Sequence, residues 1–371
     1  MEHLLEILKI IEGGVVADRS KVVAYTKQLA DKLAGSGEVE IAKRLRRILG
    51  TSKSDLISPA LLNANARLPV DNESRLALAE EKQFEEGEAQ VFLSEDVQAT
   101  ISEFLRYVSA ADRLLANGVD IHPSLLIYGP PGCGKTQLAH HVAEELHLPL
   151  LTARVDTIVS SYLGSTSKNI RSLFEHAMAR PCVLFLDEFD AIAKLRDDQH
   201  ELGELKRVVV SLLQNIDALD SKTILLAATN HEHLLDSAAW RRFAYKVHIE
   251  KPNFVSREQL FAHFLKDFSS PQDCALYAST TDGLSGAEIK QLANDAKREA
   301  ILEDKKKVEP EKVLRRILAV RLPKEINGNN QLNTRLNAAR KLDSKVFTVR
   351  RLAGIFQCST GQVSKLLNAN E

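Results

Sequence analysis

The chain has 371 residues, of which 44% are hydrophobic and 27% are charged, and its formal net charge at pH 7 is −1. The length allows more than one domain, and the near-neutral charge excludes a chain that is a polycation or a polyanion throughout. The four cysteines lie far apart without a C-x-x-C pair, so the sequence indicates neither a zinc site nor a disulfide framework. No apolar run approaches the roughly 20 residues of a membrane span, and the first residues carry acid where a signal peptide carries Lys or Arg. We therefore expect a cytoplasmic protein without membrane contact.

Residues 1–50 are predicted to form an N-terminal helical domain. Apolar residues recur there at helical spacing in three stretches, separated by Gly13-Gly14 and by Gly35-Ser36-Gly37. Basic residues line one face of the third helix, which is either a solvated surface or a docking surface for a substrate or adaptor. Residues 51–90 are polar, with an acidic stretch near their end, and are expected to be a linker.

From residue 91 to residue 252, short apolar runs alternate with amphipathic helices. Such runs are typical of strands buried on both faces, as in a parallel sheet covered by helices. The runs are 125–128, 148–151, 182–186 and 223–228. Residues 253–320 are then predicted to be all helical. Residues 325–371 are expected to form a separate basic C-terminal domain, since residues 311–371 hold 12 Lys and Arg against 4 Asp and Glu.

The strongest motif is a glycine-rich segment between a predicted strand and a predicted helix. Its glycines let the backbone wrap around phosphate, and the helix that follows adds its positive N-terminal end. Lys135 is expected to reach the β- and γ-phosphates, and the Thr136 hydroxyl to coordinate Mg²⁺. The cofactor-binding residues of this segment are Gly129, Pro130, Pro131, Gly132, Cys133, Gly134, Lys135 and Thr136. Because Cys133 lies near a helix N-terminus, a lowered thiol pKa is predicted.

A second motif is an apolar run that ends in Asp187-Glu188. Asp187 follows the carboxyl end of the predicted strand, where open α/β sheets place their ligands, and is expected to hold Mg²⁺. Glu188 is then available as the base that polarises the attacking water. Asp190 is expected to be an exposed capping or interface residue without a catalytic role.

In this order, the two motifs resemble the AAA clade proper, the group of ATPases that contains FtsH, spastin and katanin. The resemblance implies the α/β fold class, a P-loop NTPase parallel sheet sandwiched by helices over 91–252. An all-helical small AAA domain follows over 253–320, with helical N- and C-terminal additions. It also implies ATP and Mg²⁺ as cofactors and a homo-oligomer, expected to be a hexameric ring.

Further segments match the motifs of this clade residue by residue. Asn230, after Ala228-Thr229, stands at the sensor that contacts the γ-phosphate or its attacking water; the alternative is a simple turn cap. Arg241 and Arg242 resemble the arginine-finger segment, which acts in trans on a neighbour's nucleotide, although either one can instead form a structural ion pair. Gly286 and Ala287, within 283–289, are expected to face the nucleotide at a capped helix start.

The segment Ser161-Tyr162-Leu163-Gly164 resembles the central pore loop of the clade. Six copies of Tyr162 and Leu163 are expected to line a channel and to grip an extended polypeptide through apolar contact with little sequence preference. The alternative is a partly buried tyrosine on an ordinary loop. Residues 196–200 are a candidate second pore loop.

The C-terminal stretch 348–367 resembles a helix-turn-helix unit. It is predicted to bury Leu352, Ala353, Phe356, Cys358, Val363 and Leu366. The second helix is predicted to present Thr360, Gln362, Ser364 and Lys365 outward. Gln357 stands where the turn glycine is usual. The positive charge favours contact of residues 343–371 with DNA, and a structural or protein-docking role is the alternative.

Two functional hypotheses follow. The first is an ATP-driven protein remodeller that threads its substrate through the ring pore. Bacterial single-module ATPases that resemble this chain work beside a separate protease, some of them in phage defence, so such a partner is an expectation from resemblance. The second hypothesis is an ATP-switched DNA-binding regulator whose C-terminal segment reads DNA.

Overall fold

A computed structural model describes residues 68–71, 74–85, 87–158, 163–193, 204–322 and 331–368, together with a few positions between 26 and 43. The predicted helices of 1–50, most of the predicted linker, Tyr162 and the segment 196–200 therefore lie outside the described residues, apart from those few positions.

A six-stranded sheet forms the centre of the larger part of the molecule, in the order β1-β3-β4-β5-β2-β6. All neighbouring strands are parallel except β1, which runs antiparallel to β3. The strands are β1 (Ala79–Lys82), β2 (Ser124–Tyr128), β3 (Leu150–Ala153), β4 (Cys182–Leu186), β5 (Thr223–Thr229) and β6 (Tyr245–His248).

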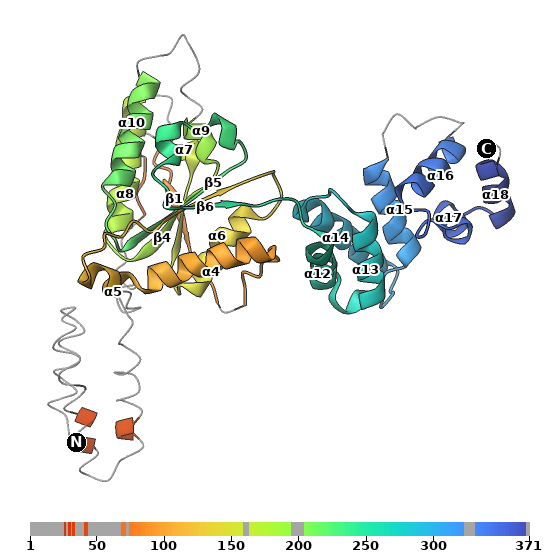
Figure 1. Ribbon diagram of the computed structural model, residues 1–371, viewed down its shortest axis with the longest axis horizontal. Coiled ribbons are helices and arrows are strands. Elements are labelled where there is room, and N and C mark those ends of the chain that lie inside the picture. Colours follow the sequence, from red (N-terminus) through yellow and green to blue (C-terminus); the bar gives the residue numbers. More distant parts are fainter. Residues whose placement is uncertain are drawn as a thin grey trace.

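Helices cover both faces of this sheet, because successive side chains of a strand point to opposite sides. Leu126 and Leu184 pack toward α8 (Leu163–Met178) and α10 (Glu204–Asp217), whereas Leu125 belongs to the core on the other face. That second face is covered by α4 (Glu95–Ser109) and α6 (Lys135–Glu145) (Figure 1). The predicted fold class, a parallel α/β sheet sandwiched by helices, is confirmed. Shorter helices connect these elements: α5 (Ala111–Ala116), α7 (Val155–Ile158), α9 (Phe189–Ala193), α11 (Ser237–Trp240) and the 3-10 turn Glu232–Leu234.

Strand β1 lies in the segment that the sequence predicts to be a linker. Its sequence is Ala-Glu-Glu-Lys, too short and too polar to show an alternating pattern, and only Ala79 is fully buried. The stretch after it is also fixed: the Glu144 carboxylate of α6 accepts hydrogen bonds from the N–H groups of Gly87 and Ala89, the latter at 2.7 Å. Residues 79–85 and 87–89 are therefore part of the α/β layer structure.

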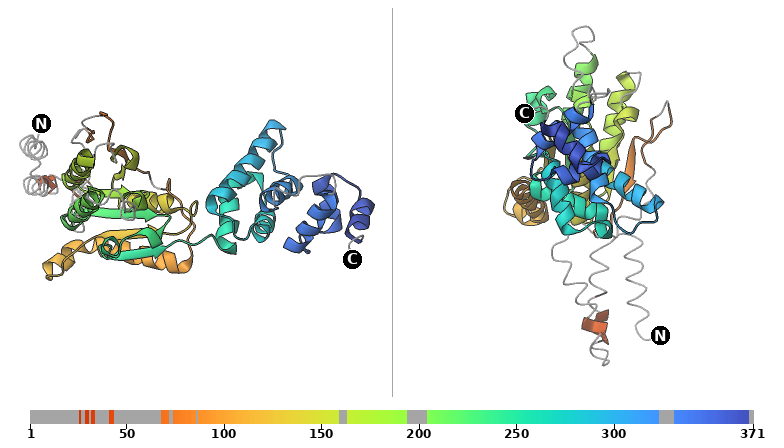
Figure 2. Two further views of the ribbon diagram at one scale, coloured as in Figure 1. Left: turned by 90° about the horizontal axis from the view of Figure 1, so that it is seen from above. Right: turned by 90° about the vertical axis from the view of Figure 1, so that its right-hand side faces the viewer.

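A helical part follows β6. Local signals at the helix starts explain its elements, since Asn253, Ser270 and Ser285 each accept a hydrogen bond from the first turn. Its helices are α12 (Phe254–Leu265), α13 (Pro271–Thr280), α14 (Gly286–Leu302), α15 (Pro310–Arg321), α16 (Gln331–Leu342), α17 (Val349–Phe356) and α18 (Thr360–Asn368), with a 3-10 turn at Lys266–Phe268. Figure 2 shows α16–α18 at the end of the molecule away from the sheet.

One apolar core runs through all of these helices. Its buried residues extend from Phe261 in α12 to Leu367 in α18, and Phe347, just before α17, is fully buried within it. The Arg315 guanidinium of α15 also donates a hydrogen bond to the Ile355 carbonyl of α17 at 3.1 Å. The sequence predicts a separate unit over 325–371; in the structure, α16–α18 instead share their core with α12–α15.

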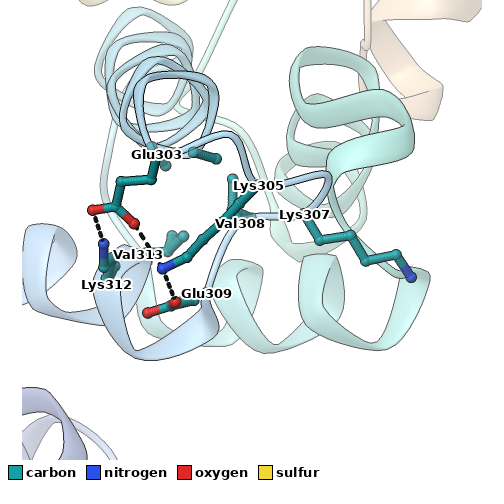
Figure 3. Close-up of a pocket in the computed structure, with 9 residues that line it drawn as sticks. Glu303, Lys305, Lys307, Val308, Glu309, Lys312 and Val313 are labelled. Carbon is teal, nitrogen blue, oxygen red and sulfur yellow. Dashed lines mark hydrogen bonds and ion pairs between the residues drawn. The ribbon is translucent and has the colours of Figure 1, made fainter.

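Ion pairs join α14 to α15 on the surface of this part. Lys305 pairs with Glu303 and Glu309, and Lys312 pairs with Glu303, as Figure 3 shows. The hydrogen bonds from Lys305 and Lys312 lower the pKa of Glu303 to about 2. No helix among the described residues is long and apolar enough to cross a membrane.

Glu303→Gln is predicted to lower the thermal stability of the helical part at neutral pH. The pKa of Glu303 is lower in the folded chain than its unfolded value of about 4.3. The wild-type protein is therefore more stable than the variant above about pH 4.3, and this difference in stability is lost as the pH falls from about 4.3 through about 2. Thermal unfolding of both proteins across this range measures the difference. Asp267→Asn, an exposed residue without an ion pair to any described residue, is the control. A difference in melting temperature that stays constant down to pH 2 would contradict the lowered pKa of Glu303.

Candidate functional site

The glycine-rich segment leaves β2 and leads directly into α6. Gly129, Gly132 and Gly134 all have positive φ angles, of 140°, 74° and 98°. Such angles are unfavourable for residues with a side chain. Gly134 is the N-cap of α6, so the segment ends at a helix N-terminus, where unpaired N–H groups and the helix dipole favour an anion. The local geometry is that of a phosphate-binding loop.

Gly129 is also required by a close backbone contact. A Cβ atom at this position would lie 2.1 Å from the carbonyl oxygen of Ile249, which follows β6. The same region is fixed by a 2.8 Å hydrogen bond from the Ile249 N–H to the Tyr128 carbonyl. The start of the loop is thus held against the chain that leads from the sheet to the helical part.

Lys135, the first residue of α6, points back into the loop. Its side-chain ammonium donates to the carbonyls of Gly129 and Pro130, both at 2.8 Å, and the residue is only 7% exposed. Burial lowers the pKa of Lys135, and the nearby Asp187 carboxylate opposes part of this shift. A cation is therefore held within the curve of the loop, where phosphate would be bound.

The second motif meets the first at the carboxyl end of β4. The Thr136 hydroxyl donates to the Asp187 carboxylate at 2.8 Å, and the other Asp187 oxygen accepts the Glu188 N–H at 2.9 Å. Glu188 is exposed and has a φ angle of 51°. A hydroxyl and a carboxylate side by side suit Mg²⁺, which takes oxygen ligands and keeps waters and substrate phosphates in its shell.

Asp190 links this region to β5, and sequence reasoning missed this role. It is 9% exposed, so the prediction of an exposed residue is wrong. Its carboxylate accepts the Thr229 hydroxyl at 2.7 Å, and the Thr229 oxygen in turn accepts the His231 N–H at 3.0 Å. Asn230 lies between these two residues and is half-buried. The buried Asp190–Thr229 contact therefore fixes the turn that carries Asn230. The only sequence signal for this role of Asp190 was its position three residues after Asp187.

The start of α14 contacts the glycine-rich loop directly. The Ala287 N–H donates to the Gly132 carbonyl at 2.9 Å, and the Cα of Gly132 faces Ser285 and Ala287 so closely that a Cβ atom would lie 3.0 Å from the Ala287 methyl. Ser285 and Glu288 form a reciprocal capping box, which agrees with the predicted capped helix start. Gly286 and Ala287 thus touch the loop that the sequence expects to bind nucleotide.

Arg241 and Arg242 are not brought to this loop. The Ser124 hydroxyl, at the start of β2, donates to the Arg242 carbonyl at 3.1 Å, so both arginines lie near the amino end of a strand whose carboxyl end leads into the loop. A cavity of about 470 Å³ at this end is lined in part by both arginines and by Asp217, Asp220 and His122.

The two arginines differ in their contacts. The Arg242 guanidinium binds both carboxylate oxygens of Asp217, at 2.8 and 2.9 Å, and donates to the Ala238 carbonyl at 2.7 Å. Arg241 is exposed, and its side chain has no ion pair or hydrogen bond with any of the described residues. A bidentate ion pair therefore holds Arg242 within the chain, whereas the Arg241 side chain is exposed.

Leu163 begins α8, but its side chain and Tyr162 are outside the described residues. Cys133 is half-buried within the loop, and burial raises the pKa of its thiol more than Lys135 and Lys251 lower it. The predicted lowered pKa is therefore wrong, because desolvation of the thiolate outweighs the neighbouring cations.

The loop, the Thr136–Asp187 pair and the strand order define the chain as a P-loop nucleotide-binding protein. Comparison with known proteins shows a family resemblance over this part of the chain. Residues 125–251 match the ATPase family associated with various cellular activities (AAA). The chain is 42% identical over 209 residues to the uncharacterized AAA family ATPase y4kL of Sinorhizobium fredii, which covers 56% of this chain and 62% of that protein.

Other relatives agree. The ATP-dependent zinc metalloprotease FtsH of Thermus thermophilus is 32% identical, in an alignment that covers 58% of this chain and 36% of FtsH. The ribosome biogenesis ATPase RIX7 of Saccharomyces cerevisiae is 34% identical, in an alignment that covers 54% of this chain and 26% of RIX7. The crystal structure of the FIGL-1 AAA domain has a TM-score of 0.55 and 25% identity, covering 72% of this chain and 92% of that domain. Residues 125–251 thus match an AAA ATPase domain, and FtsH proteins are among the relatives of this region. It spans less than two thirds of the length of these curated relatives.

Gly129→Ala is predicted to destabilise the α/β part by several kcal/mol, on the order of the larger single-residue effects, because its methyl group would collide with the Ile249 carbonyl. Chemical unfolding followed by circular dichroism measures the change. Gly87→Ala is the matched control, since Gly87 also has a positive φ angle, of 85°, but no atom lies within 4 Å of its added Cβ. Equal losses of stability in the two variants would show that backbone strain, and not the close contact with Ile249, determines the destabilisation.

Proposed function

We propose that the protein hydrolyses ATP at the interfaces of a ring, expected to have six subunits, with Arg241 acting on the nucleotide of the neighbouring subunit. The observation that carries this proposal is the separation of the two halves of the site. Lys135 and Asp187 lie at the carboxyl ends of β2 and β4, whereas Arg241 is exposed and unpaired among the described residues near the amino end of β2. A second subunit is needed to bring an arginine to the loop.

Within this proposal each residue has a distinct role. Lys135 binds the phosphates, and Thr136 and Asp187 hold Mg²⁺, which supplies charge neutralisation when bound. Glu188 accepts the proton of the attacking water, and Asn230 orients that water or the γ-phosphate. Gly286 and Ala287 face the nucleotide from α14. The exposure of Glu188 and the fixed position of Asn230 beside Asp190–Thr229 support these roles.

We further propose that hydrolysis is coupled to remodelling or threading of a protein substrate. Two of the relatives, an ATP-dependent zinc metalloprotease and a ribosome biogenesis ATPase, support work on macromolecules. Leu163 begins α8 and Tyr162 precedes it in the sequence, and we propose that these two residues grip the substrate in the pore. The N-terminal residues 1–50 then recruit substrate or adaptor, and the free cysteines support a reducing, cytoplasmic location.

A second candidate function is that of an ATP-switched DNA-binding regulator. It is favoured by one observation: α17 and α18 are joined by a three-residue turn in which Gln357 adopts the left-handed conformation usual for a turn glycine, with φ 54° and ψ 44°. Helix-turn-helix units have such short turns. Of the predicted outward positions, Thr360, Gln362 and Lys365 are exposed and Ser364 is half-buried.

Arg241→Ala is predicted to lower kcat for ATP hydrolysis by about 10³-fold or more, the effect of removing a trans arginine in other NTPases. Arg242→Ala is predicted to cost less, because Arg242 is engaged with Asp217 of its own subunit. Mixing Arg241→Ala subunits with Lys135→Ala subunits is expected to restore part of the activity, since mixed rings contain interfaces with both groups intact. A mixture no more active than the sum of its two components would contradict action in trans.

Tyr162→Ala is predicted to remove the stimulation of the ATPase rate by an unfolded protein, because the aromatic ring supplies the apolar grip. Tyr162→Phe keeps the ring and is expected to keep the stimulation. The ratio of the rates with and without the protein is the readout, and Glu188→Gln provides the blank. If Tyr162→Ala kept this ratio, and Lys365→Glu abolished an ATP-dependent activity on DNA, the regulator would replace the remodeller.

A further inference from the structure

The three C-terminal helices have a cationic surface without acidic partners. Residues 331–368 contain seven Lys and Arg but a single acid, Asp343. One Asp343 oxygen accepts the N–H groups of Lys345 and Val346, at 2.8 and 3.0 Å, and so caps the turn before α17. None of the cations forms an ion pair within the part of the chain that the structure describes: Arg335, Arg340, Lys341, Lys345, Arg350, Arg351 and Lys365.

This contrasts with α14 and α15 of the same core, where Lys305, Lys312 and Arg316 are all paired with glutamates. Unpaired cations repel one another, and a polyanion that neutralises them releases its own counterions on binding. The charge complementarity of this surface is therefore with a phosphate backbone.

The shape of the same surface fits a duplex. On α18, Val363 and Leu367 are buried, whereas Gly361, Lys365 and Asn368 are exposed along the opposite side. The Gln362 N–H donates to the Ser359 hydroxyl at 3.1 Å, which fixes the start of the helix. A short exposed helix that follows a tight turn, with cations on the helices beside it, can enter a major groove while those cations contact phosphates.

Helix α17 is joined to α15, and α15 is joined to the start of α14. Besides the Arg315–Ile355 hydrogen bond, a Cβ atom on Gly354 of α17 would lie 3.2 Å from Cγ of Glu311. At its other end α15 contacts the turn before α14, since the Arg321 guanidinium donates to the Asp282 carbonyl. The next carbonyl, that of Gly283, accepts Lys251 at 2.8 Å.

The chain of contacts ends at the phosphate-binding loop, where the Ala287 N–H of α14 donates to the Gly132 carbonyl. Packed elements of one core move together, so a ligand that changes the position of α14 also changes the position of α17 and α18. The two sites are coupled if DNA binds one position of these helices more tightly than another, and the coupling then acts equally in both directions.

We propose that the surface of α16–α18 binds duplex DNA, and that DNA bound there changes the affinity of the P-loop for ATP through α15 and α14. The linkage rests on the proposed function only in that ATP binds at the P-loop. Binding of DNA itself does not depend on it. The coupling is expected to change each affinity by at least about fivefold, the lower end of the usual allosteric range.

The test uses the full chain carrying Glu188→Gln, which prevents hydrolysis during the measurement. Fluorescence anisotropy of a labelled 30-base-pair duplex gives DNA affinity, and a fluorescent ATP analogue gives nucleotide affinity, each with and without the other ligand at saturation. The two affinities are expected to change by the same factor. DNA affinity is expected to fall at least about tenfold between 50 and 200 mM salt.

Charge-reversal variants locate the surface. Arg350→Glu with Lys365→Glu is expected to weaken duplex binding at least about tenfold. Lys307→Glu is the matched control and is expected to leave duplex binding unchanged, because Lys307 is exposed on the loop after α14 and is not part of α16–α18; its side chain points away from the other labelled residues (Figure 3). Arg315→Gln is expected to keep DNA binding but to reduce the coupling factor, since it removes the hydrogen bond between α15 and α17.

Several results would overturn the proposal. The proposed DNA site would be contradicted if heparin or an acidic polypeptide bound as tightly as the duplex and the double charge reversal had no effect on duplex binding. If saturating duplex left the nucleotide affinity unchanged, the proposed coupling would be contradicted, and the proposed DNA site would stand. Failure of the ATP analogue to bind under any condition would overturn the proposed function and the linkage together, and duplex anisotropy would still report on the surface.

Discussion

The close approach of the glycine-rich loop to two other backbones is the contact on which the rest of the structure depends. Gly129 lies against the Ile249 carbonyl, and Gly132 lies against the first turn of α14. Both contacts need a residue without a side chain, so the loop that is shaped for phosphate is also the joint between the sheet and the helical part. A ligand that reshapes the loop acts on both contacts, and the helices beyond them share one apolar core.

The parallel sheet gives the molecule two chemically different ends. Lys135, Asp187 and Asn230 follow the carboxyl ends of β2, β4 and β5. Hydrogen bonds within the chain hold Lys135 and Asp187, and the Asp190–Thr229 contact fixes the turn that carries Asn230. The amino end of β2 lies beside Arg241, which is exposed, and Arg242, which is bound to Asp217. The proposed ring uses this polarity, because head-to-tail contacts between unlike ends are the geometry that closes into rings.

Much of this arrangement could be predicted from the residues. Apolar runs such as 182–186 identify buried strands, and glycine spacing followed by Lys135-Thr136 identifies the loop, because both signals are local. Strand β1 could not be predicted, since its stability comes from pairing with β3 and not from its own Ala-Glu-Glu-Lys sequence. The same reason applies to Asp190 and Cys133: burial by distant elements determines the hydrogen bond of the first and the raised pKa of the second.

The C-terminal helices show a related limit. Their amphipathic pattern indicates α17 and α18, but a pattern shows only that a face is buried and not which partner covers it. Here the partner is α15, so a segment expected to stand apart belongs to the same core as the helices that contact the loop. Tertiary packing alone decides whether α16–α18 form an independent unit or extend the core of α12–α15.

The most direct test of the account is the ATPase rate per subunit measured across protein concentration, together with the size of the particle by sedimentation velocity in ATP. Because Arg241 and the P-loop of one subunit lie at opposite ends of a strand, the rate per subunit is predicted to rise over the same concentration range in which the ring assembles. A rate per subunit that is already full where the protein is monomeric would contradict an active site shared between neighbours.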